Sequence, residues 1–209
     1  MKTLIVVDVQ NDFLPGGALP VPEGDQVVPV INRLMEGMDL VVATQDWHPV
    51  DHLSFAANHP GRRVGEVVEI EGLKQILWPV HCVQFTGGAC FAPGLHTYKF
   101  CRIFPKGMNP KIDSYSGFFD NGHRHSTGLA DWLREQGAQE LFICGLATDY
   151  CVKFTVLDAL QLGFAVTVVE DACRAVNLQP EDGRRALEEM IQAGARVLRS
   201  EALVGSSPS

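Results

Sequence analysis

The stretch Phe142-Ile143-Cys144-Gly145-Leu146-Ala147-Thr148-Asp149-Tyr150-Cys151 decides the fold. Residues 141–144 form an apolar run typical of a short buried strand, and residues 145–149 break it. Apolar residues then recur at helical spacing from Cys151 to Gly163. Cys151 is therefore expected beside a helix N-terminus, where the dipole and free N–H groups would stabilise a thiolate. The alternative is a small core residue, the commoner fate of a free cysteine.

Strands and helices alternate on both sides of this stretch. The patterns predict strands at 4–7, 40–44, 97–104, 141–144, 165–169 and 197–198, and helices at 24–38 (starting near Pro29), 129–137, 151–163 and 181–193. Such alternation predicts an α/β fold: one three-layer α/β/α domain with a mostly parallel sheet of about six strands. We expect this domain to span 1–203, and residues 204–209 to form a disordered tail.

The segment 47–97 interrupts the alternation. Its larger part, Trp47 to Cys90, is rich in His, Pro and Gly and has weak periodicity, and residues 105–124 also read as loop. A long segment without clear elements is usually a functional loop or a small insertion. We therefore predict that residues 47–97 form an insertion that binds metal and substrate.

The bulk composition excludes several classes of partner. The 209 residues are 46% hydrophobic and 20% charged, with a formal net charge of −8, which argues against nucleic acid or an anionic membrane. The chain shows no signal peptide, no apolar run of membrane length and no C-x-x-C pair among six cysteines. We expect a cytoplasmic protein with reduced thiols. A homo-oligomer is compatible with this composition.

Four polar residues follow or end four expected strands: Asp8, Asp46, Lys106 and Cys151. Ligands bind at the carboxyl ends of the strands in such sheets, so these side chains are expected on one rim. Asp8 would take the thiol proton of Cys151, and Lys106 would favour both carboxylate and thiolate. The N–H groups of Ala147 and Cys151 would hold an oxyanion. Each residue alone is more simply a turn cap or a solvated surface group, but four such residues on one rim favour a functional site.

A second group of residues has the composition of a metal site. Asp46 and His48 are two apart and would point the same way in an extended segment, and His81 would reach in from farther along the chain. One carboxylate and two imidazoles with open positions suit one divalent ion: zinc, iron or manganese. His52 is either a fourth ligand or an outer group.

These motifs together resemble the nicotinamidase (pyrazinamidase) family of isochorismatase-like cysteine hydrolases. The resemblance rests on Val7-Asp8-Val9-Gln10-Asn11-Asp12-Phe13, Gln45-Asp46-Trp47-His48-Pro49, Trp78-Pro79-Val80-His81-Cys82, Lys106-Gly107 and Gly145-Leu146-Ala147-Thr148-Asp149-Tyr150-Cys151. The Asp–Lys–Cys set alone would indicate the superfamily, and the D-W-H and W-P-x-H segments single out nicotinamidases.

The resemblance implies hydrolysis of nicotinamide, and of pyrazinamide, to the acid and ammonia in NAD salvage, through a thioester on Cys151. It makes Asp8 the general base and then the proton donor to ammonia. Metal ligands would be Asp46, His48 and His81, with the ion on the pyridine nitrogen. It further implies a cis Leu146–Ala147 peptide and a substrate pocket lined by Phe13, Trp78, Tyr115 and Leu146.

The chain departs from the family in residues 85–91, which puts the local loop in question. His52 aligns with a histidine that is a ligand in only some members, so it is left out of the metal set. Two alternatives stay open: a related amidase with another small amide as substrate, and a non-catalytic α/β module with a structural metal.

Overall fold

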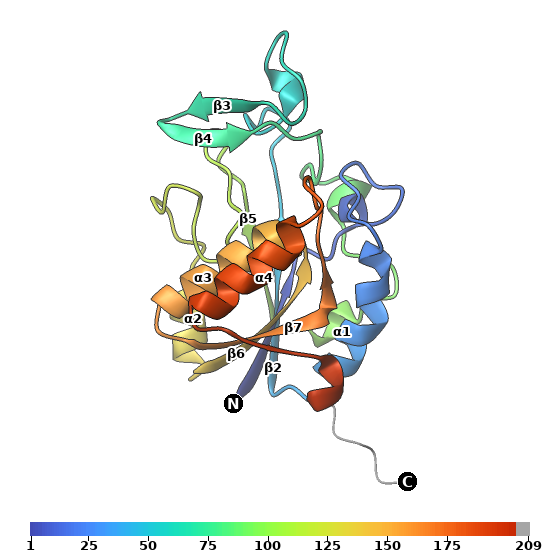
Figure 1. Ribbon diagram of the computed structural model, residues 1–209, viewed down its shortest axis with the longest axis vertical. Helices are drawn as coiled ribbons and strands as arrows, with labels where there is room; N and C mark the ends of the chain where they lie inside the picture. Colours follow the sequence, from blue (N-terminus) through green and yellow to red (C-terminus); the bar gives the residue numbers. More distant parts are fainter. Residues whose placement is uncertain (204–209) are drawn as a thin grey trace.

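The computed structural model describes residues 1–203, and the tail expected at 204–209 lies outside the described residues. The strands are β1 (Lys2–Val7), β2 (Leu40–Asp46), β3 (Val67–Ile70), β4 (Leu73–Ile76), β5 (Arg102–Lys106), β6 (Glu140–Leu146), β7 (Ala165–Arg174) and β8 (Arg196–Leu198). The helices are α1 (Val27–Met35), α2 (Leu129–Glu135), α3 (Lys153–Gln161) and α4 (Asp182–Gln192) (Figure 1).

Six strands form one sheet in the order β5-β2-β1-β6-β7-β8, and every neighbouring pair is parallel. The expected six-stranded parallel sheet is therefore confirmed. The central strands β1 and β6 are buried along nearly their whole length because both faces are covered, which explains their continuous apolar sequences. Their carboxyl ends consequently meet in the middle of the sheet.

Helices cover the sheet on both faces. The chain moves from β1 to β2 in one direction along the sheet and from β6 to β8 in the other. Right-handed crossovers therefore place α1 on one face and α3 and α4 on the opposite face, where the two helices lie side by side (Figure 1). Helix α1 packs its apolar side inward through Val27, Val28, Ile31, Leu34 and Met35.

Glycine at position 145 lets β6 approach β1. Gly145 has a φ of 122°, and a Cβ there would lie 2.1 Å from the carbonyl oxygen of Val7. Only glycine fits such a close backbone contact. It brings the end of β6, with the Leu146–Ala147 peptide, beside the end of β1; that peptide is cis, as the resemblance implies.

The structure corrects several expected boundaries. The strand expected at 97–104 is a 3₁₀ turn (Thr97–Lys99) followed by β5, so Lys106 ends the strand instead of following it. The helix expected from Cys151 begins at Lys153, because a π-helical turn spans Thr148–Val152. Helix α1 starts at Val27, with Pro29 inside its first turn. Strand β7 runs on to Arg174, beyond its strongly apolar part.

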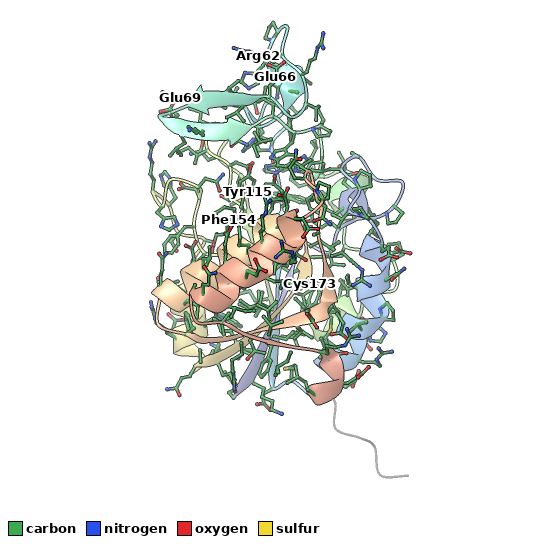
Figure 2. All side chains as sticks on the ribbon, viewed as in Figure 1. Arg62, Glu66, Glu69, Tyr115, Phe154 and Cys173 are labelled. Atoms are coloured by element: carbon green, nitrogen blue, oxygen red, sulfur yellow. The ribbon has the colours of Figure 1, made fainter. Side chains whose placement is uncertain are left out.

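The segment 47–97 holds more structure than its sequence indicates. Strands β3 and β4 form an antiparallel hairpin, and 3₁₀ turns lie at Ala56–Asn58 and Gly87–Ala89. In Figure 1 the hairpin projects beyond the sheet, at the end opposite the N-terminus. This is the end of the sheet where the carboxyl end of β1 lies. Figure 2 labels Glu69 on this hairpin, and Arg62 and Glu66 on the segment that leads into it. This insertion therefore covers the rim where the expected site residues gather.

Within residues 1–203, no helix combines the length and the apolar character needed to cross a membrane. All six cysteines belong to this described part, and none forms a disulfide bond.

Candidate active site

Lys106 lies at the centre of the rim and joins four groups. Its Nζ is 2.8 Å from Asp8 Oδ2, and it also binds Asp46 Oδ1. It donates to the carbonyl of Ser114 at 2.7 Å and lies 3.4 Å from Cys151 Sγ. Burial opposes its charge, but the two carboxylates outweigh burial and hold the pKa of Lys106 well above its usual value. Lys106 is therefore a permanent cation with 2% of its surface exposed.

Cys151 occupies the π-helical turn between β6 and α3, and its thiol opens into a pocket. Burial raises the pKa of this thiol well above its usual range; Lys106 lowers it, and Asp8 and Asp46 raise it further. Burial first, and the two carboxylates after it, thus oppose the stabilisation of a thiolate. The pKa direction therefore favours a thiol that needs a base before it can attack, and the stabilisation of a thiolate by the helix N-terminus stays a prediction.

Asp8 is the group placed to accept that thiol proton. It has a φ of 47°, in the left-handed region that costs a non-glycine residue about 1–2 kcal/mol. Its Oδ1 accepts a hydrogen bond from Thr44 Oγ1 at 2.7 Å, and a carboxylate oxygen lies within 4.8 Å of Cys151 Sγ. Burial raises the pKa of Asp8 above its usual value, although Lys106 opposes the shift. A more basic carboxylate is a better proton acceptor.

Two histidines direct their Nε2 atoms at Asp46. His48 Nδ1 lies 2.9 Å from the carbonyl of Gly107, and His81 Nδ1 lies 2.8 Å from that of Pro79. Carbonyls only accept, so each Nδ1 donates its proton there, and each Nε2 faces Asp46. These Nε2 atoms lie 3.4 and 3.7 Å from Asp46 Oδ2. Carboxylate and imidazole donors thus converge from two chain segments, one with Asp46 and His48 and one with His81.

The donor set of Asp46, His48 and His81 fits a divalent ion. One donor atom from each residue lies within 4.8 Å of the others, and all three residues are buried. His48 Nε2 has no hydrogen-bond partner among residues 1–203, although it is buried. A buried nitrogen lone pair without a donor is costly in the folded protein, and a metal ion would satisfy it.

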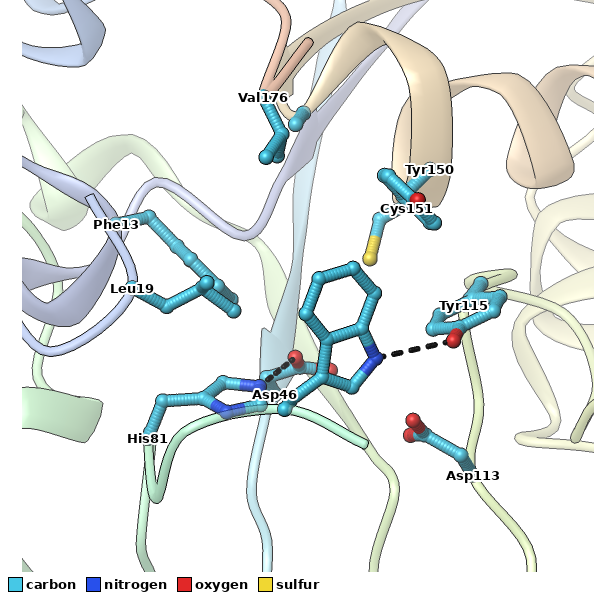
Figure 3. A pocket seen from close by; sticks show the side chains of 11 residues that line it. Phe13, Leu19, Asp46, His81, Asp113, Tyr115, Tyr150, Cys151 and Val176 are labelled. Carbon is cyan, nitrogen blue, oxygen red and sulfur yellow. Dashed lines mark hydrogen bonds and ion pairs between the residues drawn. The ribbon is translucent and has the colours of Figure 1, made fainter. Parts of the chain in front are cut away.

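Cys151 and two residues of the donor set, Asp46 and His81, line one pocket. In Figure 3, Phe13 and Leu19 line one side, Tyr115 and Tyr150 line the other, and the sulfur of Cys151 points into the space between them. The full lining comprises Phe13, Leu19, Asp46, Trp78, His81, Asp113, Tyr115, Ala147, Tyr150, Cys151 and Val176. Aromatic walls with few polar groups suit a small flat ligand.

Hydrogen bonds connect the insertion to the pocket wall. Trp78 Nε1 donates to Tyr115 Oη at 3.1 Å, drawn as a dashed line in Figure 3. Gln75 of β4 donates to Asp113 Oδ2 at 3.3 Å. Tyr115 also packs against Phe154 of α3, with ring centroids 5.5 Å apart, and both are labelled in Figure 2. These contacts fix the insertion over the catalytic rim.

The structure brings together Asp8, Lys106 and Cys151, the donor set Asp46, His48 and His81, and the wall residues Phe13, Trp78 and Tyr115. Ala147 also lines the pocket. Leu146 does not: its side chain is fully buried, and its Cδ1 packs near Gly24.

Sequence reasoning missed four pocket residues: Leu19, Asp113, Tyr150 and Val176. It also assigned no role to Gln10, whose side-chain amide exchanges two 2.8 Å hydrogen bonds with the backbone of Asp46. The position of Gln10 three residues after a buried strand was the available signal.

Comparison with known proteins gives the class first. The isochorismatase domain model matches residues 2–202. The chain, with its parallel sheet and a cysteine at the rim, is therefore an isochorismatase-like protein. The nicotinamidase of Escherichia coli (strain K12) is 54% identical over 198 residues, which cover 93% of this chain and 92% of that protein.

Two solved structures agree. A nicotinamidase/pyrazinamidase from Acinetobacter baumanii is 44% identical with a TM-score of 0.94, covering 97% of each chain. The pyrazinamidase of Pyrococcus horikoshii, in complex with zinc, is 42% identical with a TM-score of 0.77, covering 95% of this chain and 98% of that one. This chain belongs to the nicotinamidase family.

Proposed function

We propose that the protein hydrolyses nicotinamide to nicotinate and ammonia in NAD salvage, through a thioester on Cys151, and that it also accepts pyrazinamide. The observation that carries the proposal is one pocket lined by the Cys151 thiol and by two metal donors, Asp46 and His81, with Asp8 within 4.8 Å of the thiol. The chain's 54% identity to a nicotinamidase supports this substrate. The nucleophile must stay reduced, which suits the cytoplasm.

In the first step, Asp8 accepts the thiol proton as Cys151 Sγ attacks the amide carbonyl. The new S–C bond gives a tetrahedral oxyanion, for which the N–H groups of Ala147 and Cys151 are the proposed donors. Asp8 then passes its proton to the amide nitrogen, the C–N bond breaks, and ammonia leaves. Lys106 holds Asp8 beside the sulfur and balances the charge that moves between them.

In the second step, Asp8 accepts a proton from a water molecule, and the oxygen of that water attacks the thioester carbonyl. The S–C bond breaks, the proton on Asp8 passes to sulfur, and nicotinic acid leaves and ionises to nicotinate, with the thiol restored. Asp8 therefore serves as base and acid in turn, and the buried ammonium of Lys106 keeps its charge in both steps.

Asp46, His48 and His81 would hold one divalent ion, which when bound supplies a Lewis acid for the pyridine nitrogen and so orients the ring. We propose zinc first because a relative binds zinc, while iron and manganese suit the same donors. The side-chain amide of Gln10 holds Asp46 in position through two hydrogen bonds to the backbone of Asp46.

Removal of the ion is expected to weaken substrate binding without inactivating the thiol. A chelator-treated sample should lose nicotinamide binding in calorimetry, whereas iodoacetamide should still alkylate Cys151. Zinc added back should restore binding. Unchanged nicotinamide affinity in a sample shown to be metal-free would contradict the assignment of Asp46, His48 and His81.

The Tyr115 hydroxyl is expected to act through Trp78. Tyr115→Phe removes the acceptor for Trp78 Nε1, and one hydrogen bond is worth about 0.5–1.5 kcal/mol. We expect KM for nicotinamide to rise roughly 2–10-fold, with kcat changed less than about twofold. The matched control is Tyr98→Phe at an exposed position, and steady-state kinetics of both variants decide.

The experiment that tests the function follows ammonia release from a panel of amides: nicotinamide, pyrazinamide, benzamide and aliphatic amides. The proposal expects the two ring-nitrogen amides to have the highest kcat/KM. A faster aliphatic amide would favour the related-amidase alternative, and no release from any amide would favour a non-catalytic module.

A further inference from the structure

Asp149 is a buried carboxylate on the nucleophile turn that takes no part in the proposed reaction. It lies in the π-helical turn Thr148–Val152, two residues before Cys151, and 5% of its surface is exposed. Each of its oxygens accepts a backbone N–H from one distant loop: Oδ1 from Val176 at 2.9 Å and Oδ2 from Asn177 at 2.8 Å. Hydrogen bonds to a carboxylate are stronger than those between neutral groups, so this contact fixes the loop to the turn.

The loop that Asp149 holds connects β7 to α4, and it is also fixed at its far end. Asn177 has a φ of 52°, in the left-handed region, and its Oδ1 accepts from the N–H of Gly183 in the first turn of α4 at 2.8 Å. A Cβ at Gly183 would lie 2.6 Å from that of Ala175, so the loop packs directly on the start of this helix. The loop therefore has two anchors, Asp149 and α4.

Val176 is the residue of this loop that reaches the substrate pocket. It lines the pocket together with Cys151, and Figure 3 shows it on the side opposite His81 and Asp46. In the proposed reaction the ring nitrogen of nicotinamide points to the metal donors and the carboxamide points to Cys151. Carbon 4 lies across the ring from the nitrogen, so it faces Val176.

We propose that Asp149 is a positioning residue that holds Val176 against the substrate ring, so that Val176 limits what the pocket accepts at ring carbon 4. The inference rests on the proposed hydrolysis of nicotinamide and adds a determinant of selectivity to it. A valine on a freely moving loop would yield to a larger ring, whereas two hydrogen bonds to a buried carboxylate hold its backbone in place. One methyl group too many in a tightly bounded apolar pocket is rejected about 10–200-fold.

The two hydrogen bonds can be measured without substrate or metal. Residue-resolved hydrogen exchange by NMR shows whether the amides of Val176 and Asn177 are protected, and we expect both to exchange at least ~10-fold more slowly than unprotected loop amides. In Asp149→Asn at least one of them should exchange ~10-fold faster, because asparagine keeps a single side-chain oxygen. Unprotected exchange of both amides in wild type would overturn the inference, whatever the activity of the enzyme.

Val176→Ala tests the selectivity and leaves Asp149 unchanged. We expect it to raise kcat/KM for 4-methylnicotinamide, relative to that for nicotinamide, about 10–100-fold over the wild-type ratio. Comparing ratios between variants cancels the intrinsic reactivity of each amide. The matched probe is 6-methylnicotinamide, whose methyl group lies beside the ring nitrogen and away from Val176, so its ratio should change less than about twofold. An equal change for both probes, or no change for either, would overturn the inference.

Asp149→Asn is expected to act on the substrate through Val176. It should raise KM for nicotinamide about 2–10-fold, keep kcat within about threefold of wild type and shift the 4-methylnicotinamide ratio upward. In Asp149→Asn/Val176→Ala the ratio should equal that of Val176→Ala alone, because the contact that Asp149 positions is already gone. The matched control is Asp182→Asn, which removes the acceptor for the N–H of Gln179 in the same loop and should leave both ratios unchanged.

The kinetics separate this role from a purely structural one. A residue that only shaped the turn around Cys151 would lower kcat and leave the choice between the two methylated amides unchanged. That result, or fully multiplicative effects in the double variant, would overturn the inference. No hydrolysis of nicotinamide by wild type would instead reject the proposed function, and the exchange of the Val176 and Asn177 amides would then decide whether Asp149 holds the loop.

Discussion

Cys151→Ala is expected to lower kcat for nicotinamide at least ~10⁴-fold, because no other group in the pocket can form the thioester. Of the described cysteines, only Cys151 lines the pocket. Alanine removes the sulfur and leaves the aromatic walls and the metal donors in place. Zinc content and the affinity for nicotinamide should therefore stay near wild type, which separates loss of chemistry from loss of folding. Ammonia release under single-turnover conditions measures the effect.

The matched control for Cys151→Ala is Cys101→Ala, which removes an exposed thiol outside the pocket. Its turnover is expected to equal that of wild type. Turnover by Cys151→Ala at the wild-type rate would contradict covalent catalysis and leave the non-covalent alternatives.

Lys106→Met is expected to produce the second large effect, on stability as well as activity. The ammonium faces both Asp8 and Asp46, so its removal leaves the buried carboxylate of Asp8 without a cation and takes from Asp46 its strongest charge partner. Breaking a buried ion pair in this way typically costs about 3–5 kcal/mol of unfolding free energy. Urea unfolding followed by fluorescence measures the loss at neutral pH.

The pH dependence gives this variant a distinctive signature. A buried carboxyl that loses its cation takes up a proton more readily, so its pKa in the folded state rises above that of the unfolded chain. The folded state then binds more protons, and the stability deficit shrinks as the pH falls. The control is Lys111→Met, which breaks an exposed pair with Glu71 and should cost less than about 1 kcal/mol. A similar cost for both variants would contradict the central role of Lys106.

The sequence was most informative where burial is complete. Strands β1 and β6 are buried on both faces, so their apolar runs appear directly in the sequence. The rim residues Asp8 and Cys151 follow from the position where those runs end. The metal donors Asp46 and His48 were recognisable because a carboxylate and an imidazole two residues apart are typical metal ligands.

The sequence failed where the outcome depends on partners distant in the chain. β5 pairs with β2 only over Arg102–Lys106, and nothing in residues 97–101 reveals that the preceding turn is 3₁₀. The raised pKa of the Cys151 thiol depends on burial together with Asp8 and Asp46, which no local pattern encodes. The π-helical turn at residues 148–152 likewise depends on tertiary contacts and not on the local sequence alone.

Pocket residues outside the motifs were missed for a similar reason. Asp113 and Val176 reach the pocket from segments that follow β5 and β7, and their neighbours in sequence carry no metal or nucleophile signal. Leu146 was expected at the substrate, but its side chain turns toward Gly24 in the core. Side-chain direction at the end of β6 follows from the backbone geometry there.

The central claim is that nicotinamide is cleaved through a bond to the sulfur of Cys151. Intact-protein and peptide mass spectrometry on enzyme quenched with acid during turnover tests it directly. The account predicts a mass increase of one nicotinoyl group on the peptide that contains Cys151, and its loss on treatment with hydroxylamine. Rapid ammonia release with no adduct on that peptide, or with the adduct on another residue, would contradict it.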